Sequence, residues 1–72
     1  MPYALSEDLP PAIKRSLPSH AQDIFRSVFN SAWAGYGQNA PGRREEMAHR
    51  VAWAAVEKRY RKLQGGWEPI AG

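Results

Sequence analysis

Apolar residues recur along the second half of the chain with the spacing of one long amphipathic helix. The stretch from Glu45 to Leu63 contains no Gly or Pro, and a helix turns by about 100° per residue. At that spacing one wide face carries Glu45, His49, Ala52, Trp53, Val56, Tyr60 and Leu63. A narrower stripe on the opposite side consists of Met47, Val51 and Ala54. We therefore expect a helix over 45–63 that contacts neighbours on two sides and stands at the centre of the domain.

A short helix is predicted near the N-terminus. Pro10 and Pro11 suit the first turn of a helix, whereas Pro18 cannot continue one, so this helix spans roughly Pro10 to Ser16. Its apolar residues recur at a spacing of four and form a single stripe: Leu9, Ile13 and Leu17.

A second helix is predicted from His20 to Tyr36, with Ser19 as its N-cap and Gln22 completing a capping box. Its broad apolar face consists of Ile24, Phe25, Val28, Phe29, Ala32, Trp33 and Tyr36. Residues 37–42 then form a loop rich in Gly, Asn and Pro. Two alternatives remain for the N-cap of the third helix, namely Asn39 and Gly42.

The glycines at 65 and 66 end the third helix and leave an extended tail, Trp67 to Ile70. This tail can fold back to place Trp67 and Ile70 on the core, or pair with residues 1–5 as a minor two-stranded ribbon. The predicted fold is all-α, a single domain over residues 1–72 in which the short first helix leads into a hairpin of the other two. Most of its core is expected from Phe25, Phe29, Trp33, Val51, Trp53, Val56 and Tyr60.

The composition adds limits to this picture. A chain of 72 residues buries only about 60% of the surface exposed by its unfolded form, so three Trp, two Phe and three Tyr must supply much of the stability. There are no cysteines, which excludes disulfides and thiolate metal sites. A signal peptide and an apolar run of about 18 residues are also lacking. We expect a soluble, cytoplasmic protein.

The net charge of +3 is unevenly distributed. Residues 1–42 are balanced, whereas residues 43–62 carry seven basic against three acidic groups. Two i,i+4 ion pairs are expected on an exposed helix face, Glu46 with Arg50 and Glu57 with Arg61. The excess basic charge can attract phosphates, acidic proteins or anionic lipid, or simply keep a small protein in solution. The sequence leaves these interpretations open.

Six basic side chains are the candidate contacts for a protein partner or for phosphate groups: Arg43, Arg44, Lys58, Arg59, Arg61 and Lys62. On an ideal helix Arg44, Arg59 and Lys62 fall within about 60° of one another, so we expect them to share a face. Nucleic-acid binding also requires aromatic side chains that are free to stack on bases, and here the core needs them.

Catalytic chemistry has little support in the sequence. His20 and His49 are its two histidines, and neither belongs to a metal-ligand motif. We expect His49 to be hydrogen-bonded at the edge of the core and His20 to serve in capping or packing. Nucleophile elbows, phosphate-binding glycine loops and calcium loops are absent. The prediction is a protein that is not an enzyme and binds no metal or cofactor.

Several segments together resemble the ChaB family of small bacterial proteins. The most specific are LPSHAQDIF at 17–25 and AHRVAWAAVEKRY at 48–60, and MPY, DLP and FNSAW add to them. The resemblance spans nearly the whole chain and implies a small, mostly helical domain. By family name it also implies a regulator of cation transport, acting on a sodium or calcium/proton antiporter.

Two functional hypotheses follow. The resemblance implies a non-enzymatic regulatory module that acts through a protein partner, for which the cytoplasmic side of a cation/proton antiporter is one candidate. The alternative is a nucleic-acid-associated domain that uses the basic ends of the third helix. Relatives of the family that occur beside domains resembling the N-terminal part of the Rho termination factor keep this alternative open.

Overall fold

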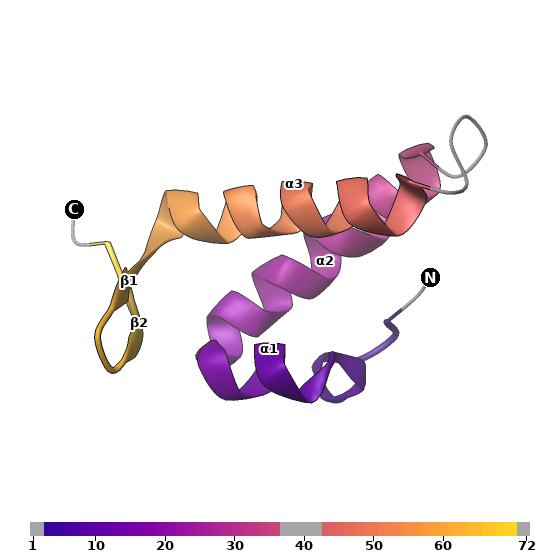
Figure 1. The fold of residues 1–72 in the computed structure, drawn as a ribbon. Coiled ribbons are helices and arrows are strands. Elements are labelled where there is room, and N and C mark those ends of the chain that lie inside the picture. The colour runs from indigo at the N-terminus through magenta and orange to yellow at the C-terminus, as the bar shows by residue number, and fades with distance from the viewer. Residues whose placement is uncertain (1–2, 37–42, 71–72) are drawn as a thin grey trace.

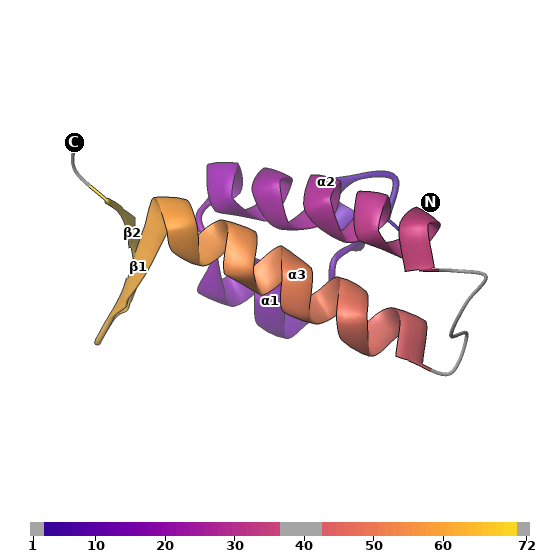
Figure 2. The same cartoon turned by 90° about the horizontal axis from the view of Figure 1, so that it is seen from above.

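A computed structural model describes residues 3–36 and 43–70. The elements in order are η1 (Ser6–Asp8), α1 (Pro11–Ser16), α2 (Ser19–Tyr36), α3 (Arg44–Arg59), β1 (Tyr60–Leu63) and β2 (Gly66–Pro69). α2 and α3 run antiparallel as a hairpin, and α1 lies beneath this pair (Figures 1 and 2). The strands project from the end of α3 (Figure 1). The all-α prediction is therefore correct for the helices but missed a small two-stranded antiparallel sheet.

α1 begins where two prolines set the backbone. Pro10 is the N-cap, and Pro11 occupies the first helical position, where a helix does not need a backbone N–H donor. Leu17 follows the helix with extended angles, φ −106° and ψ 137°, because a residue before a proline disfavours the helical region. The predicted helix from Pro10 to Ser16 is confirmed to within one residue.

α2 begins one residue earlier than predicted. The Gln22 N–H donates to the Pro18 carbonyl at 2.9 Å, so Ser19 already belongs to the helix. The Gln22 side-chain amide donates to the carbonyls of Leu17 and Lys14, at 2.8 and 3.1 Å. The predicted capping box is therefore wrong, because Gln22 connects the start of α2 to the end of α1 instead.

α3 ends before the predicted limit at Leu63. Its last helical residue is Arg59, and Tyr60 has extended angles of φ −132° and ψ 152°. Helical periodicity extended the prediction because Tyr60 and Leu63 also fall on the apolar face. In the structure, pairing with β2 replaces the last helical turn and places Trp67 against Trp53. The two alternative N-caps, Asn39 and Gly42, lie outside the described residues.

The register of the β1–β2 hairpin accommodates Pro69, which has no backbone N–H to donate. Tyr60 pairs with Pro69, and the Ile70 N–H donates to the Arg59 carbonyl at 2.9 Å. Hydrogen-bonded and non-bonded pairs alternate along an antiparallel ladder, so Pro69 occupies a non-bonded position. Its missing N–H therefore leaves no gap in the ladder.

The C-terminal tail folds back, but in a different way from either expectation. Trp67 stacks on Trp53 with ring centroids 5.5 Å apart, which confirms its predicted contact with the core. Ile70 remains 48% exposed, so its predicted burial is wrong. The alternative pairing with residues 1–5 is not formed by residues 3–5, the part of that segment that the structure describes, and β2 pairs with β1 directly before it. A neighbouring strand closes a much shorter loop than the distant N-terminus would.

The N-terminal segment is attached to α2. The Tyr3 N–H donates to Asn30 Oδ1 at 3.2 Å, and Asn30 Nδ2 donates to the Tyr3 carbonyl at 2.8 Å. The Tyr3 ring also contacts the Phe29 ring, with centroids 5.1 Å apart. These contacts hold the start of the described chain on the helical hairpin.

The buried core joins all three helices to the start of β1. It comprises Leu9, Ile13, Leu17, Ala21, Phe25, Phe29, Ala48, Ala52, Val56 and Tyr60. This set contains the stripe predicted for the first helix and four of the seven residues predicted for the core. Trp33 and Trp53 are partly buried and pack against it.

The placement of Val51 in the core is wrong, because its side chain is 37% exposed. α3 directs Ala48, Ala52 and Val56 into the core. Val51 and Trp53 lie about 100° to either side of Ala52. The large indole of Trp53 can reach back to the core from there, whereas the short Val51 side chain cannot. α3 thus packs mainly through one face. In its second apolar stripe Val51 and Ala54 are exposed and Met47 is half-buried.

Candidate interaction site

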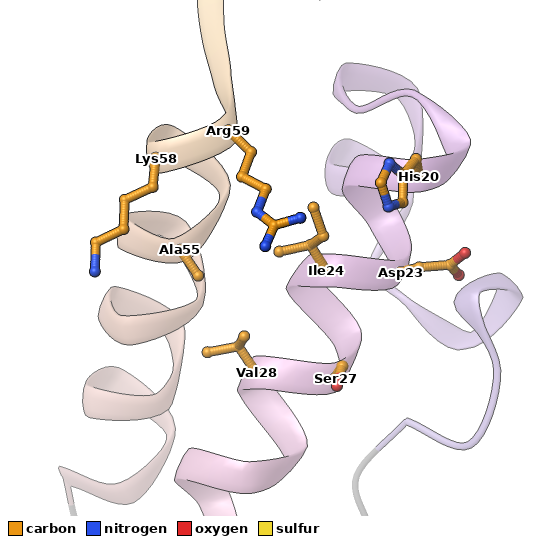
Figure 3. Close-up of a pocket in the computed structure, with 8 residues that line it drawn as sticks. All are labelled: His20, Asp23, Ile24, Ser27, Val28, Ala55, Lys58 and Arg59. Atoms are coloured by element: carbon orange, nitrogen blue, oxygen red, sulfur yellow. The ribbon is translucent and has the colours of Figure 1, made fainter. Parts of the chain in front are cut away.

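An open groove of about 430 Å³ lies between α2 and α3, close to the end of α3 (Figure 3). Its volume falls within the range of roughly 300–1,000 Å³ that is usual for binding sites. The residues that line it are His20, Asp23, Ile24, Ser27 and Val28 from α2, and Ala55, Lys58 and Arg59 from α3.

The floor of the groove is aliphatic. Ile24 and Val28 are half-buried and lie one residue before Phe25 and Phe29, which point into the core. Helical geometry turns each of them about 100° from its buried neighbour, to the edge of the hairpin. Ala55 is the α3 residue on this floor, and its small side chain leaves the space between the helices open (Figure 3).

Two cations border this floor at the last turn of α3. Lys58 and Arg59 are exposed, and the partial negative charge at a helix C-terminus stabilises cations there. The Arg59 guanidinium extends across the gap toward Ile24, whereas the Lys58 ammonium points away from α2 (Figure 3). Within the described residues the two ion pairs are Glu46–Arg50 and Arg61–Glu68, so both groove cations are available to a ligand.

The polar groups on α2 complete the rim. The Asp23 carboxylate points away from α3 (Figure 3). His20 meets the buried Tyr60 ring edge-on, with centroids 6.2 Å apart, which agrees with its predicted packing role. Ser27 lies one turn further along α2, at the middle of the helix.

The structure separates the basic residues that were expected to share a face. Arg44 and Arg59 are at opposite ends of α3, about 22 Å apart along its axis, and Lys62 belongs to β1. Arg44 is engaged within the fold, because its Nε donates to the Trp33 carbonyl at 2.8 Å and its guanidinium lies 4.2 Å from the ring centroid. The expected helical face shared by Arg44, Arg59 and Lys62 is therefore wrong for Lys62, which is in a strand.

The remaining candidate cations are Arg61 and Lys62, which are neighbours in β1 with side chains on opposite faces of the strand, and Arg43 at the other end of α3. Arg61 forms an ion pair with Glu68 across the hairpin at 2.8 Å, in place of the expected pair with Glu57, because it is in a strand rather than a helix. Arg43 is exposed at the N-cap of α3, and Lys62 is exposed opposite Trp67. Of the six candidates, Lys58 and Arg59 are the two that border a groove.

The described residues contain no group of three or more His, Asp or Glu side chains that could hold a metal ion. Trp53 Nε1–H donates to His49 Nε2 at 2.7 Å, and the His49 ring contacts Phe25 at 5.6 Å. The prediction of a hydrogen-bonded histidine at the core edge is thus confirmed.

No helix in the described part of the chain is both long and apolar enough to span a membrane.

The groove was not predicted from the sequence. Helical periodicity places Ile24 and Val28 on the core face of the second helix, and Ala55 on neither apolar stripe of the third. The width of that face was a usable signal, because a single partner helix covers only part of so broad a surface. The depth of the groove depends on the α2–α3 packing, which no local pattern contains.

Comparisons with known proteins agree on one family. The ChaB family model matches residues 9–69. The Escherichia coli K12 protein named "Putative cation transport regulator ChaB" is 53% identical over 66 residues, which cover 86% of this chain and 87% of that protein. The Shigella flexneri protein of the same name matches equally well.

The fold comparison gives the same result. A solution NMR structure, described as that of "the putative cation transport regulator ChaB", superposes with a TM-score of 0.85 at 45% identity, covering 97% of this chain and 100% of that one. The family match extends over most of the chain and through all three helices and both strands. This chain belongs to the ChaB family.

Proposed function

We propose that this chain is a non-enzymatic regulatory module that modulates sodium or calcium/proton antiport from the cytoplasmic side, by binding a protein partner. The observation that carries the proposal is its family membership, with a 53% identical relative named as a cation transport regulator. The α2–α3 groove supports a binding role, because Lys58 and Arg59 border an aliphatic floor suited to a protein segment.

Binding of nucleic acid has less support. Arg44 is engaged with Trp33. The other candidate cations are divided between the two ends of α3 and β1. The aromatic rings contact one another in and around the core: Phe25 with Trp53, Phe29 with Trp33, and Trp53 with Trp67. A stacking platform for bases beside a continuous basic surface is what nucleic-acid binding would require.

The test is a transport assay in inverted membrane vesicles that contain a sodium or calcium/proton antiporter from the same cell. A proton gradient is established, Na⁺ or Ca²⁺ is added, and the rate of gradient loss is measured with and without the purified chain. We expect the chain to change this rate in a saturable way, and to have no effect on vesicles that lack the antiporter. An unchanged rate at a large excess of chain contradicts the proposal.

A fluorescence-anisotropy titration with labelled oligonucleotides examines the alternative. We expect any binding at low salt to disappear at physiological salt, because scattered cations make few simultaneous phosphate contacts. Binding that persists there and is abolished in the triple variant Arg44→Glu, Arg59→Glu and Lys62→Glu would favour the nucleic-acid hypothesis.

A further inference from the structure

We propose that the α2–α3 groove is the docking site for an acidic amphipathic helix of the partner protein. Its apolar side chains would contact Ile24, Val28 and Ala55, and its carboxylates would pair with Lys58 and Arg59. The inference rests on the proposed function only in that the partner is a protein.

The spacing of the apolar residues on the floor of the groove favours a helical segment as the partner. Ile24 and Val28 are one helical turn apart on α2, about 6 Å along its axis, and Ala55 faces them from α3 (Figure 3). A partner helix that carries apolar residues at i and i+4 presents the same repeat. Amphipathic helices commonly bind in this way, with anchors one turn apart in an apolar groove. The floor is only half-buried within the chain, so such a helix would remove exposed apolar surface from water.

The charges of the groove select an acidic partner. Lys58 and Arg59 are exposed on one side, and the Asp23 carboxylate across the groove points away from α3 (Figure 3). The groove is therefore electropositive where α3 ends. The planar guanidinium of Arg59 can bind a carboxylate through two parallel hydrogen bonds, and this would orient the incoming helix as well as attract it.

Other occupants fit the groove less well. A second copy of the chain would bring the same excess of positive charge, since each copy has a net charge of +3, and like charges oppose association. Nucleic acid would find an aliphatic floor in place of a stacking surface, because His20 is the one ring among the residues that line the groove.

An NMR titration tests the inference with a designed probe. The ¹⁵N-labelled chain is titrated with a helical peptide that carries Leu at i, i+4 and i+7 and Glu at the flanking positions. A second peptide has Lys in place of every Glu. We expect chemical-shift changes concentrated at Ile24, Val28, Ala55, Lys58 and Arg59, and at least tenfold weaker binding of the Lys peptide.

Charge reversal provides a matched comparison. Lys58→Glu and Arg59→Glu should each weaken binding of the acidic peptide at least tenfold. Arg43→Glu makes the same change in net charge on an exposed residue, about 24 Å from Arg59 along α3, and should change the Kd less than twofold. Circular dichroism on each variant shows that the helices are retained.

Several outcomes would overturn the inference. A Kd weaker than about 1 mM for the acidic peptide, shifts centred away from the groove, or equal effects of Arg43→Glu and Arg59→Glu would each do so. A concentration-dependent dimer that uses the same residues would show that a second copy of the chain occupies the groove. Oligonucleotides that compete for these residues at physiological salt would show that nucleic acid does.

The same variants separate this inference from the proposed function. If the wild-type chain alters antiport and both groove variants alter it equally, the docking site is wrong while the regulatory role stands. If the wild-type chain has no effect on antiport, the regulatory role fails, and the peptide titration alone decides whether the groove binds an acidic helix.

Discussion

Arg44 shows how a residue that looks like a ligand contact can serve the fold. The last carbonyls of a helix lack partners within the helix, and the Arg44 Nε donates to one of them, the Trp33 carbonyl, at 2.8 Å. Its guanidinium also lies over the Trp33 ring, a favourable cation–π position. The side chain thus connects the end of α2 to the start of α3.

Trp53 joins three parts of the molecule, so its removal should be costly. It meets Phe25 edge-on at 5.2 Å, stacks on Trp67 at 5.5 Å and donates a hydrogen bond to His49. We expect Trp53→Ala to lower the free energy of unfolding by about 3 kcal/mol, near the low end for such truncations because the indole is partly exposed. Urea unfolding followed by circular dichroism measures this change.

Val51→Ala is the control for this prediction. Its side chain is 37% exposed, and surface substitutions usually change stability by less than about 0.5 kcal/mol. If Trp53→Ala melts within a few degrees of the parent chain, or if Val51→Ala is the more damaging change, the assignment of these two residues is reversed.

At the scale of elements, the hairpin depends on contacts outside itself. An isolated two-stranded hairpin is at best marginally stable in water. Here the stacking of Trp67 on Trp53 attaches β2 to α3. The Arg61–Glu68 ion pair lies on exposed side chains, and such pairs typically contribute little. The hairpin therefore forms chiefly because it covers part of the helical core.

Gly66 and Gly65 provide a matched pair of tests for the hairpin turn. Gly66 has φ of 148°, which L side chains rarely adopt, whereas Gly65 has no positive φ, and a methyl group would meet no neighbour at either site. We expect Gly66→Ala to destabilise the hairpin by about 1–3 kcal/mol and Gly65→Ala to have little effect. Amide hydrogen exchange of Arg61 and Glu68, which form the next hydrogen-bonded pair of the ladder, reports on hairpin opening. Equal exchange rates in the two variants would show that the turn does not need the unusual angle.

At the scale of the whole molecule, Tyr3 in the N-terminal segment makes the free energy of unfolding depend on pH in the alkaline range. Burial, together with the nearby Glu45 carboxylate, raises the pKa of the Tyr3 phenol above its ordinary value of 10.0. The folded state thus favours the neutral phenol. This contribution is fully present below about pH 10 and is lost as the pH rises through the higher folded-state pKa.

Unfolding experiments between about pH 9 and 12 test this linkage. We expect stability to fall across the upper part of this window, and Tyr3→Phe to reduce that fall, because Phe keeps the ring contact with Phe29 without an ionisable group. Tyr60→Phe is the control for phenol ionisation elsewhere in the core. A decline that is equally steep in the parent chain and in Tyr3→Phe would show that Tyr3 is not its source.

The sequence by itself determined the helices. Prolines placed the limits of α1, the apolar repeat placed α2 and most of α3, and the residue types excluded disulfides. Each of these signals acts within a few residues along the chain, through backbone sterics or through which side chains share a helical face. The resemblance to the ChaB family also rests on short stretches of consecutive residues.

Tertiary structure alone decided the rest. The pairing of β1 with β2 overrode helical periodicity after Arg59, because it placed Trp67 on Trp53. The engagement of Arg44 with Trp33 and the groove that joins Ile24 to Arg59 both connect α2 to α3. Such contacts depend on how two helices pack, and the energy of packing belongs to pairs of distant residues, so no local pattern could have revealed which cations were left for a partner.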